Sequence, residues 1–522
     1  MKRLAILIIL FSLGVVLSAQ TTRKIKLIKA NSIEYDSRYL KAQRILGNVV
    51  FEHEGSRMYC DSAWLYEDEN RLKAFGKVKI IDPSGMSLVG NGLDYDGNEQ
   101  LAEVREDVVM RDAEMTLTTD LVQYQLTDRR ASYFGGGKII SSKNNNILTS
   151  ESGFYFADSK VFHFKDDVEL VNPDYTMFTD TLHYHSYNEQ AYFFGPTTIV
   201  SEENNIYCEN GWYDTMKDRA RFGENARIWS KEQTLSSDSL FYDREKGLGE
   251  AFRNVLIEDT TNRVQIRGNY GQYLELKDES YVTGQALMEQ FFKTDTLFVH
   301  ADTLRMLPDT LEKRRILAYY NVRMFKKDMQ GICDSLCYAE ADSTLSMFEE
   351  PILWSDVNQI SGTQIDVFAY EGKLQQFFIP SESFIISEVD SIHYNQIKGR
   401  EMRGQFKENV LKTVTISGNG ECIYYATEAE EDSIPHPEAR IIGVNKGACS
   451  DIRVHLIDNE IDRVNFMTKP ENAFYPLEKL DAKELILKDF IWKDALRPKD
   501  RNDLFRSKES ASVLNETSSS TD

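Results

Sequence analysis

The sequence predicts an all-β fold built from tandem repeats, and three observations support this. An aromatic residue, or Met in one case, returns every 29 to 33 residues. A polar or acidic residue stands four positions before each one, and clusters of turn-forming residues fall twice per repeat. Such a period is typical of architectures in which stacked units bury a shared core. The recurring positions are Tyr35, Tyr66, Tyr95, Tyr124, Tyr155, Tyr184, Tyr213, Tyr242, Tyr273, Met306, Tyr338 and Phe368.

Each repeat is expected to contain two strands of about ten residues, because two turns divide it. Twelve repeats then give roughly 24 strands, and no 3.6-residue periodicity competes with this pattern between residues 31 and 368. In ten repeats an apolar residue also stands seven positions before the aromatic one. Side chains alternate along a strand, so two residues an odd number apart cannot share a face of a regular strand. The strand is therefore predicted to bend near its polar residue and to contribute to two sheets.

The residues at the bend have a predicted structural role. Stacked Asn and Asp side chains at such a corner can satisfy backbone groups as a polar ladder. A recurring glycine that opens the next strand is expected to mark a bend or bulge rather than a phosphate-binding loop. The ladder residues are Asn91, Asp120, Asp180, Asp238, Asn269, Asp302 and Asp334, and the glycines are Gly47, Gly76, Gly195, Gly223 and Gly284.

The two ends of the chain differ from the repeats. Lys2 and Arg3, an apolar run over 4–17 and Ala19 predict a cleavable signal peptide over residues 1–19, hence an exported protein. The repeats are expected over 25–420. A terminal strand pair with an acidic loop is expected over 421–475, a helical segment over 476–498 and a disordered tail over 499–522.

Composition limits the partners and the covalent links. The formal charge of −22 becomes 59 − 83 = −24 without Lys2 and Arg3, which disfavours nucleic acid and anionic surfaces as partners. Six cysteines in an exported chain permit disulfides. Cys422 and Cys449 form the best candidate pair, and buried free thiols remain the other possibility.

No enzyme, cofactor or metal site is predicted. The blocks that begin at Ser237 and Cys333 resemble a serine-esterase nucleophile motif, but both fall inside the repeated phrase, where Asp has a structural position. His183 and His185 share one face of a strand without an evident third metal ligand. The Asp and Glu column lacks the Gly-rich loops of calcium-binding β-rolls.

The repeated phrase resembles the OstA/LptA family of periplasmic lipopolysaccharide-transport proteins, specifically the long OstA-like proteins. The resemblance rests on residues 58–66 (MYCDSAWLY), on residues 72–78 (LKAFGKV) and on the Gly47-Asn48-Val49 strand opening, and it covers roughly residues 25–420. It implies an elongated open β-jellyroll of about twelve two-stranded repeats, with an apolar groove between two sheets. Lipid A acyl chains would occupy the groove, and further lipopolysaccharide-transport proteins would stack end to end by their strands.

The resemblance implies a non-catalytic lipid-binding and bridging protein in the periplasm, with association with the outer membrane left open. The residues expected to line the groove are Trp64, Leu93, Val122, Leu182, Leu240, Leu304 and Leu336. The same residues could instead fill a closed core. A structural or adhesive cell-envelope scaffold without lipid cargo therefore remains an alternative, as does a carbohydrate-active enzyme, which would need carboxylates facing each other across the cleft.

Overall fold

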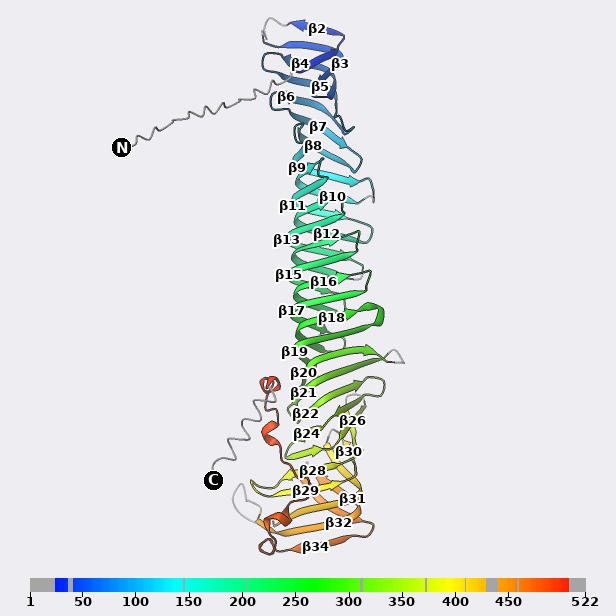
Figure 1. Cartoon of the computed structure of the whole chain (residues 1–522), viewed down its shortest axis with the longest axis vertical. Helices are drawn as coiled ribbons and strands as arrows, with labels where there is room; N and C mark the ends of the chain where they lie inside the picture. Colours follow the sequence, from blue (N-terminus) through cyan, green and yellow to red (C-terminus); the bar gives the residue numbers. More distant parts are fainter. Residues whose placement is uncertain are drawn as a thin grey trace, which may run out of the picture. The chain divides into compact units, whose positions relative to one another are not determined.

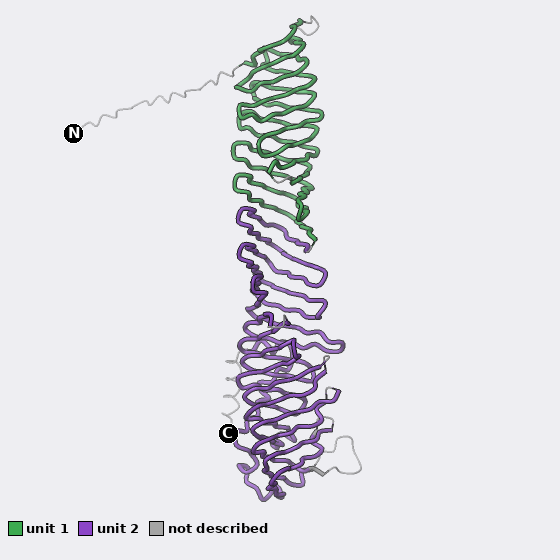
Figure 2. Tube along the Cα trace, turned by 90° about the vertical axis from the view of Figure 1, so that its right-hand side faces the viewer, with its two compact units in different colours: residues 1–202 green, residues 203–522 purple. Residues whose placement is uncertain are grey.

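The computed structural model describes residues 24–35, 41–143, 146–202, 204–309, 313–370, 373–408, 410–428, 440–457 and 460–506. The predicted signal peptide, most of the acidic loop and the chain after residue 506 lie outside the described residues. The chain divides into two compact units, unit 1 (residues 1–202) and unit 2 (residues 203–522), and each is described by itself (Figure 2).

Unit 1 is an antiparallel meander in which each strand from β3 to β13 pairs with the next along the chain (Figure 1). The short strands β1 and β2 pair with the two halves of β3. The strands are β1 (Lys26–Lys29), β2 (Ser32–Tyr35), β3 (Gln43–His53), β4 (Ser56–Tyr66), β5 (Arg71–Ile81), β6 (Ser87–Asp96), β7 (Leu101–Arg111), β8 (Met115–Gln125), β9 (Arg130–Ser141), β10 (Ile147–Phe156), β11 (Val161–Val171), β12 (Tyr175–His185) and β13 (Gln190–Ser201).

A two-residue bulge interrupts the middle of each odd-numbered long strand. In β3, Leu46 pairs with Ser62 and Val49 with Cys60, so Gly47 and Asn48 together oppose Asp61. Both bulge residues have positive φ, +78° and +45°. The predicted bend is thus confirmed, with glycine at positive φ in four of the five recurring positions; Gly223 instead directly precedes its bulge. The bulge residues with positive φ are Gly47, Asn48, Gly76, Lys77, Glu106, Asp107, Gly135, Gly136, Asp166, Asp167 and Gly195 in unit 1, and Glu224, Asn225, Arg253, Asn254, Gly284, Gln285, Tyr320 and Asn321 in unit 2.

The bulges divide each long strand into two halves, which we call arms. Arm A is the half next to the turns that follow β3, β5, β7, β9 and β11, and arm B is the half next to the turns that follow β4, β6, β8, β10 and β12. Along β4 the buried side chains are Met58 and Cys60 in arm A, then Ala63 and Leu65 in arm B. The alternation changes phase at the bend, so both arms face one interior.

Unit 2 begins with the same meander and then separates into two sheets. Strands β14 to β22 pair in sequence, and β22 pairs through its arm A half with β24 and through its arm B half with β23. From there β24, β25, β28 and β29 extend arm A, while β23, β26, β27 and β30 extend arm B. The long strand β31 pairs with both β29 and β30 and so rejoins the arms. Separate short strands thus replace the bent strands of the predicted repeat here.

The elements of unit 2 have the following bounds: β14 (Asn205–Asp214), β15 (Arg219–Trp229), β16 (Gln233–Asp243), β17 (Leu248–Asp259), β18 (Val264–Leu274), η1 (Glu275–Lys277), β19 (Glu279–Phe291), β20 (Thr296–Pro308), β21 (Arg314–Lys326), β22 (Met329–Ala339), β23 (Thr344–Phe348), β24 (Ile352–Ser355), β25 (Asn358–Ser361), β26 (Gln364–Tyr370), β27 (Lys373–Ile379), β28 (Ser383–Glu388), β29 (Tyr394–Gly399), β30 (Glu401–Lys407), β31 (Val410–Glu428), β32 (Arg440–Ile457), β33 (Glu460–Met467), β34 (Glu471–Tyr475), η2 (Leu477–Lys479), η3 (Ala482–Leu485), η4 (Asp494–Leu496) and η5 (Asn502–Phe505).

Residues 477–505 form a C-terminal strap that runs across the strands of arm A in unit 2. Two glutamines, each 1% exposed, bind its backbone. The Gln396 amide donates to the Leu485 carbonyl and accepts from the Leu487 N–H, both at 2.8 Å. The Gln359 amide makes the same pair of 2.8 Å bonds with Ile491 and Lys493. Each glutamine amide therefore bonds to one carbonyl and one N–H of the strap, as the backbone of a neighbouring strand would.

The strap contains short 3-10 turns, and no α-helix occurs in the part of the chain that the structure describes. Its two glutamine contacts lie six residues apart along the strap but two strand spacings apart in the sheet, on β29 and β25. Two spacings are about 10 Å, half the reach of six extended residues. The strap must coil to fit, which accounts for the apolar pattern that predicted a helical segment. None of the described helices is long and apolar enough to cross a membrane.

Replacing a bulge glycine should weaken the bend locally. A Cβ at Gly76, where φ is +76°, would lie 2.7 Å from Asp61 Oδ2. We expect Gly76→Ala to cost about 2 kcal/mol of local stability, measured by hydrogen exchange of the β4–β6 amides. Gly92→Ala is the matched control, because nothing lies within 4 Å of its added Cβ. Equal exchange in the two variants would contradict the role of the bulge.

Removing one glutamine should release the strap. Gln359→Leu keeps the side-chain volume but leaves the Ile491 carbonyl and the Lys493 N–H without their partner, which should cost about 1–3 kcal/mol. Faster proteolysis of residues 486–495 is the expected readout. The control is Gln375→Leu, since Gln375 is an exposed residue of β27. A strap as resistant to protease in Gln359→Leu as in the control would show that the amide contacts do not hold it.

Candidate functional site

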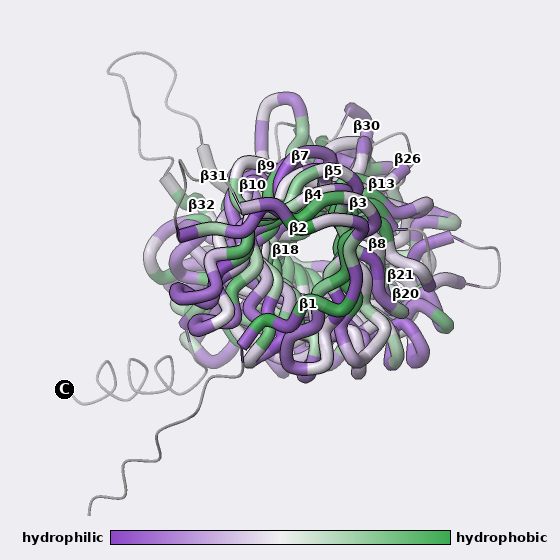
Figure 3. The backbone as a smooth tube through the Cα atoms, turned by 90° about the horizontal axis from the view of Figure 1, so that it is seen from above, coloured by the Kyte–Doolittle hydropathy of each residue, from purple (hydrophilic) through white to green (hydrophobic). Residues whose placement is uncertain are grey.

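The interior between the arms is lined by two continuous columns of side chains in register. Figure 3 shows hydrophobic stretches (green) within the strands and hydrophilic colour at many turns. In unit 1 the arm A column comprises Phe51, Met58, Ile80, Leu88, Met110, Leu117, Ile139, Leu148, Leu170, Met177 and Ile199. The arm B column comprises Leu65, Leu72, Tyr95, Ala102, Tyr124, Ala131, Tyr155, Phe162, Tyr184 and Ala191.

Three tyrosines of the arm B column hydrogen-bond to the tips of arm A, and we call these contacts the tyrosine clasps. The Tyr95 hydroxyl lies 2.6 Å from His53 Nδ1, and the Tyr124 hydroxyl donates to Asp82 Oδ2 at 2.9 Å. Tyr155 donates to Asp112 in the same way. The partners stand at opposite ends of strands of about ten residues, which would be about 30 Å apart if the strands were straight. The clasps therefore require the strands to be folded at the bulges.

The central clasp is a buried, charge-assisted contact. Asp82 is 5% exposed and also accepts from Arg129 Nε at 3.3 Å. Burial raises the pKa of its carboxyl, but hydrogen bonds from Ser84 and Tyr124 and the Arg129 charge outweigh burial and hold the pKa below its usual value. Burial, and next the nearby Asp82 charge, raise the pKa of the Tyr124 hydroxyl. At neutral pH the acceptor is therefore charged and the donor keeps its proton.

Ion pairs between the same two edges reinforce the clasps in unit 1. Lys160, after β10, donates to Glu114, after β7, at 2.9 Å. Lys143, after β9, donates to Glu189, after β12, at 3.3 Å. The members of both columns from β4 to β9 are buried, with Tyr95 and Tyr124 each 1% exposed. From β4 to β9 the interior of unit 1 is thus filled by its own side chains and closed along its edges, whereas Leu170, Tyr184 and Ile199 toward its β13 end are partly exposed.

Unit 2 has an arm A column and an arm B column of its own. The arm A column comprises Ile206, Ile228, Leu235, Ile257, Ile266, Met288, Val299 and Met324. The arm B column comprises Tyr213, Ala220, Tyr242, Gly249, Tyr273, Ser280, Met306, Ile316 and Tyr338.

Strands β14–β18 of unit 2, which we call the open section, differ in exposure from strands β4–β9 of unit 1. Side chains near the bend are buried, including Cys208, Ala226 and Val255. The column members nearer the tips are partly exposed: Ile206, Ile228, Leu235 and Ile257 in arm A, and Tyr213 and Tyr242 in arm B. Tyr273 is 42% exposed. The open section therefore presents an apolar trough with a packed floor.

Tyrosine hydroxyls in the open section bind acids on their own edge. Tyr213 donates to Asp218 at 2.8 Å, Tyr273 to Asp278 at 3.5 Å, and Tyr242 to Glu275. Burial, followed by the bond to Glu275, raises the pKa of Tyr242 to about 12. The arms also approach each other at the tip of β17, within the open section, where Arg314 Nη1 lies 3.7 Å from Asp259 Oδ2.

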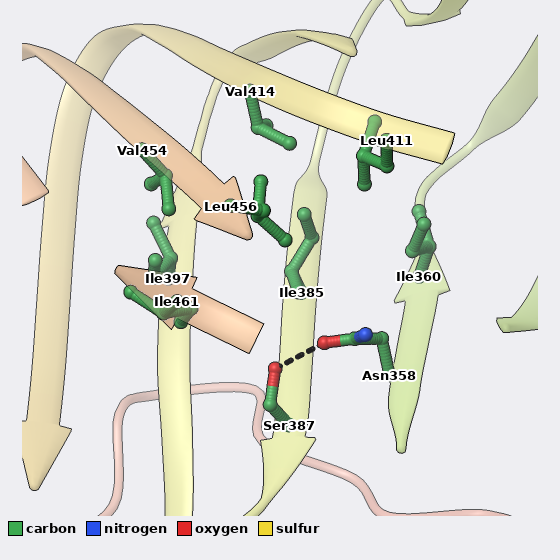
Figure 4. A pocket seen from close by; sticks show the side chains of 10 residues that line it. All are labelled: Asn358, Ile360, Ile385, Ser387, Ile397, Leu411, Val414, Val454, Leu456 and Ile461. Atoms are coloured by element: carbon green, nitrogen blue, oxygen red, sulfur yellow. Dashed lines mark hydrogen bonds between the residues drawn. The ribbon is translucent and has the colours of Figure 1, made fainter. Parts of the chain in front are cut away.

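The far part of unit 2 holds one small cavity between the sheets (Figure 4). Its volume of about 20 Å³ suits a water molecule rather than an acyl chain. Eight apolar side chains line it, and Ser387 donates to Asn358 at its edge. This part of the interior is a packed core.

Six of the seven residues expected to line a groove lie on the inner side of the arms. Leu93, Val122, Leu182, Leu240, Leu304 and Leu336 are 0–4% exposed. Trp64 differs: it is partly exposed, whereas its neighbours Ala63 and Leu65 are buried. Leu65, not Tyr66, is in register with Leu72 and Tyr95, so the sequence period was misaligned by one residue in this repeat. The partly exposed trough, moreover, is lined nearer the tips than these six residues.

The residues of the expected polar ladder lie at the bend, exposed or partly exposed. Three of them bond to side chains of the bulges, whereas Asp180 and Asp334 accept from the adjacent Thr181 and Ser335 hydroxyls. Asp238 accepts from Asn254 at 2.9 Å and Asp302 from Asn321 at 2.8 Å, while Asn91 donates to Asp107 at 3.5 Å. Asp180 and Asn269 contact the space that a Cβ on Gly195 or Gly284 would occupy. Asp120 and Asp334 occupy the equivalent positions in β8 and β22.

The histidines and cysteines form no evident centre. His163 lies opposite His183, with stacked rings 3.9 Å apart. Among the described residues, no group of three or more His, Cys, Asp or Glu side chains could hold a metal ion. All six cysteines are free thiols, including Cys422 and Cys449 on the neighbouring strands β31 and β32.

Sequence reasoning missed the clasp acceptors and the role of the arm A column. His53, Asp82 and Asp112 precede their tyrosines by 42 or 43 residues and differ in type, so no single residue type recurs. Among the long strands, the apolar residue seven positions before the aromatic residue lies on an even-numbered strand and predicts about half of the arm A column. The other half consists of its partners on the odd-numbered strands, which the pairing of adjacent strands could have identified.

Comparisons with known proteins support the resemblance of the repeats to OstA-like proteins. Residues 22–180 and 176–238 match the family model of OstA-like proteins. No curated protein sequence matches the chain significantly. A crystal structure to which the chain is similar is that of LptH, described as the LptA-homologous periplasmic component of the conserved lipopolysaccharide transport device from Pseudomonas aeruginosa. The identity is 14% and the TM-score 0.16, covering 28% of this chain and 94% of LptH.

At that TM-score the likeness to LptH has no weight, and the assignment rests on the family model. The matched residues 22–238 include all of the bent strands of unit 1 and the first bent strands of unit 2. Through these repeats, residues 22–238 of the chain match the OstA-like protein family.

Proposed function

We propose that this protein is a non-catalytic lipid-binding and bridging protein of the periplasm that acts in lipopolysaccharide transport to the outer membrane. The observation that carries the proposal is the open section, where apolar side chains of both columns are partly exposed between the arms. Partly exposed Ile and Leu in a concave position favour an apolar ligand. The match of residues 22–238 to the OstA-like family supports the same conclusion, because that resemblance implies lipopolysaccharide transport.

The geometry of the trough suits acyl chains with a polar group outside. The floor near the bend is apolar and packed, and the inner columns offer Ile206, Ile228, Leu235 and Ile257 on one wall. On the other wall, Tyr213, Tyr242 and Tyr273 present rings inward, while their hydroxyls bind acids at the edge. Acyl chains would contact the columns, and sugars and phosphates would remain in water at the mouth.

Bridging is supported by the free edge of the first strands of unit 1. Among the described residues, β1 and β2 pair only with β3, and seven of their eight residues are exposed. An unpaired strand edge can take up a strand of another chain. We propose that further lipopolysaccharide-transport proteins stack at this edge.

The filled interior of unit 1 favours a second candidate, a cell-envelope scaffold without lipid cargo. In that case the open section would be a weakly packed part of a continuous core. The two functions differ in whether lipid contacts Leu235 and Tyr242.

A photo-crosslinking amino acid in the open section should capture lipid. We expect p-benzoylphenylalanine at Leu235 or Tyr242 to form adducts with purified lipopolysaccharide, read by mass spectrometry of the intact protein. Leu88 and Tyr95 are the matched control positions, because they occupy the same columns but are buried in unit 1. Adducts there should be about tenfold fewer, as expected for a site closed by about 1.4 kcal/mol or more.

The absence of adducts at both Leu235 and Tyr242 would contradict lipid carriage and favour the scaffold. Equal yields at all four positions would contradict the assignment of the cargo to the open section.

A further inference from the structure

The tyrosine clasps join parts of the sheet that no ladder of hydrogen bonds connects. Tyr95 on β6 reaches His53 at the end of β3, with β4 and β5 between these strands. Tyr124 on β8 reaches Asp82, which directly follows β5, and Tyr155 on β10 reaches Asp112, which directly follows β7. Each clasp thus spans the same interval and the same mouth.

The arms can separate without loss of strand pairing. Consecutive strands remain paired on both sides of every bulge, so the bends form a line of hinges across the meander. Rotation about that line breaks the contacts between arm A and arm B but no ladder bond. Side-chain packing, the clasps and the edge ion pairs are what hold unit 1 shut.

The open section provides an internal comparison within the same chain. Tyr242 and Tyr273 occupy the arm B column as Tyr95 and Tyr124 do. Their hydroxyls bind Glu275 and Asp278 on their own edge, and the Tyr273 ring is 42% exposed, whereas the clasped Tyr124 ring is 1% exposed. Hydrogen bonds from Tyr95 and Tyr124 to the opposite arm therefore coincide with the burial of these tyrosines.

We infer, resting on the proposed function, that unit 1 is a gated stretch of groove: the clasps Tyr95–His53, Tyr124–Asp82 and Tyr155–Asp112 hold it shut, and lipid acyl chains enter it only when the clasps break. The gate acts on hydrocarbon chains, because the space that it closes is lined by the two apolar columns. An acyl chain in unit 1 would contact the same apolar side chains that pack against each other in the closed state. The hydrogen bonds of the clasps exist only in the closed state, so they decide between the closed and the lipid-filled state.

The test measures the distance between the two edges directly. Spin labels at Glu54 and Glu99, both exposed, report on the mouth at the Tyr95 clasp, and labels at Glu232 and Lys277 report on the open section. The variant Tyr95→Phe/Tyr124→Phe/Tyr155→Phe removes three hydroxyls and keeps every ring. The matched control, Tyr242→Phe/Tyr273→Phe, removes hydroxyls that bind their own edge.

We expect the clasp variant to lengthen and broaden the distance distribution of the Glu54–Glu99 pair, while the control variant leaves it unchanged. With a crosslinker at Leu88, lipopolysaccharide adducts should increase about tenfold or more in the clasp variant, as expected when the hydrogen bonds of Tyr124 and Tyr155 to carboxylates are lost. Asp82→Asn, which keeps the shape of the acceptor and removes its charge, should shift the distances in the same direction with Tyr124 intact.

An unchanged Glu54–Glu99 distance in both the clasp variant and Asp82→Asn would overturn the gate. Because the distances are measured without lipid, that result would leave the proposed function standing. If the clasp variant lengthens the Glu54–Glu99 distance but no position forms lipid adducts, the clasps do hold the arms together. That result would reject lipid carriage, and with it the lipid gate.

Discussion

The fold depends on one backbone feature, the two-residue bulge with positive φ in each odd-numbered long strand. At Gly47–Asn48 and Gly76–Lys77 the pair opposes a single residue of the neighbouring strand, and the strand bends. A straight meander of this length would be a flat sheet with two exposed faces. The bends bring its two halves face to face, and the apolar columns and the clasps follow from that contact.

The balance between a closed and a filled interior is close in energy. Opening one repeat would half-expose about six apolar side chains, such as Leu88, Tyr95 and Met110, at a cost of about 5–10 kcal/mol. An acyl chain of about twelve methylenes regains about 10 kcal/mol on burial, at about 0.8 kcal/mol each. Since these terms nearly cancel, clasps worth about 1.5–3 kcal/mol each can set the outcome. In the open section the tyrosine hydroxyls bind acids on their own edge, and part of the apolar surface is already exposed. Binding an acyl chain there therefore needs less opening of the arms.

The sequence period sufficed to predict the all-β class, the bend and the inward position of Leu93, Val122 and Leu240, because burial and strand alternation are local properties. It failed at Trp64 and Tyr66, where an aromatic pair mimicked the period one residue out of register. The clasps could not be found, because their partners lie more than 40 residues apart and the acceptor changes from His53 to Asp82. The strap was predicted as a helix because its conformation depends on contacts with strands that are distant in sequence. A local apolar pattern carries no information about those contacts.

Lipid analysis of the purified full-length protein tests the central claim most directly, namely that the arms of the open section hold acyl chains. Protein isolated from its own cell envelope and extracted with organic solvent should yield about one lipopolysaccharide or phospholipid per chain by mass spectrometry. Ile257→Asp, which places a charge on the trough wall, should remove that lipid, whereas a change at the outward-facing Phe241 should not. A wild-type chain that carries no lipid would contradict the account.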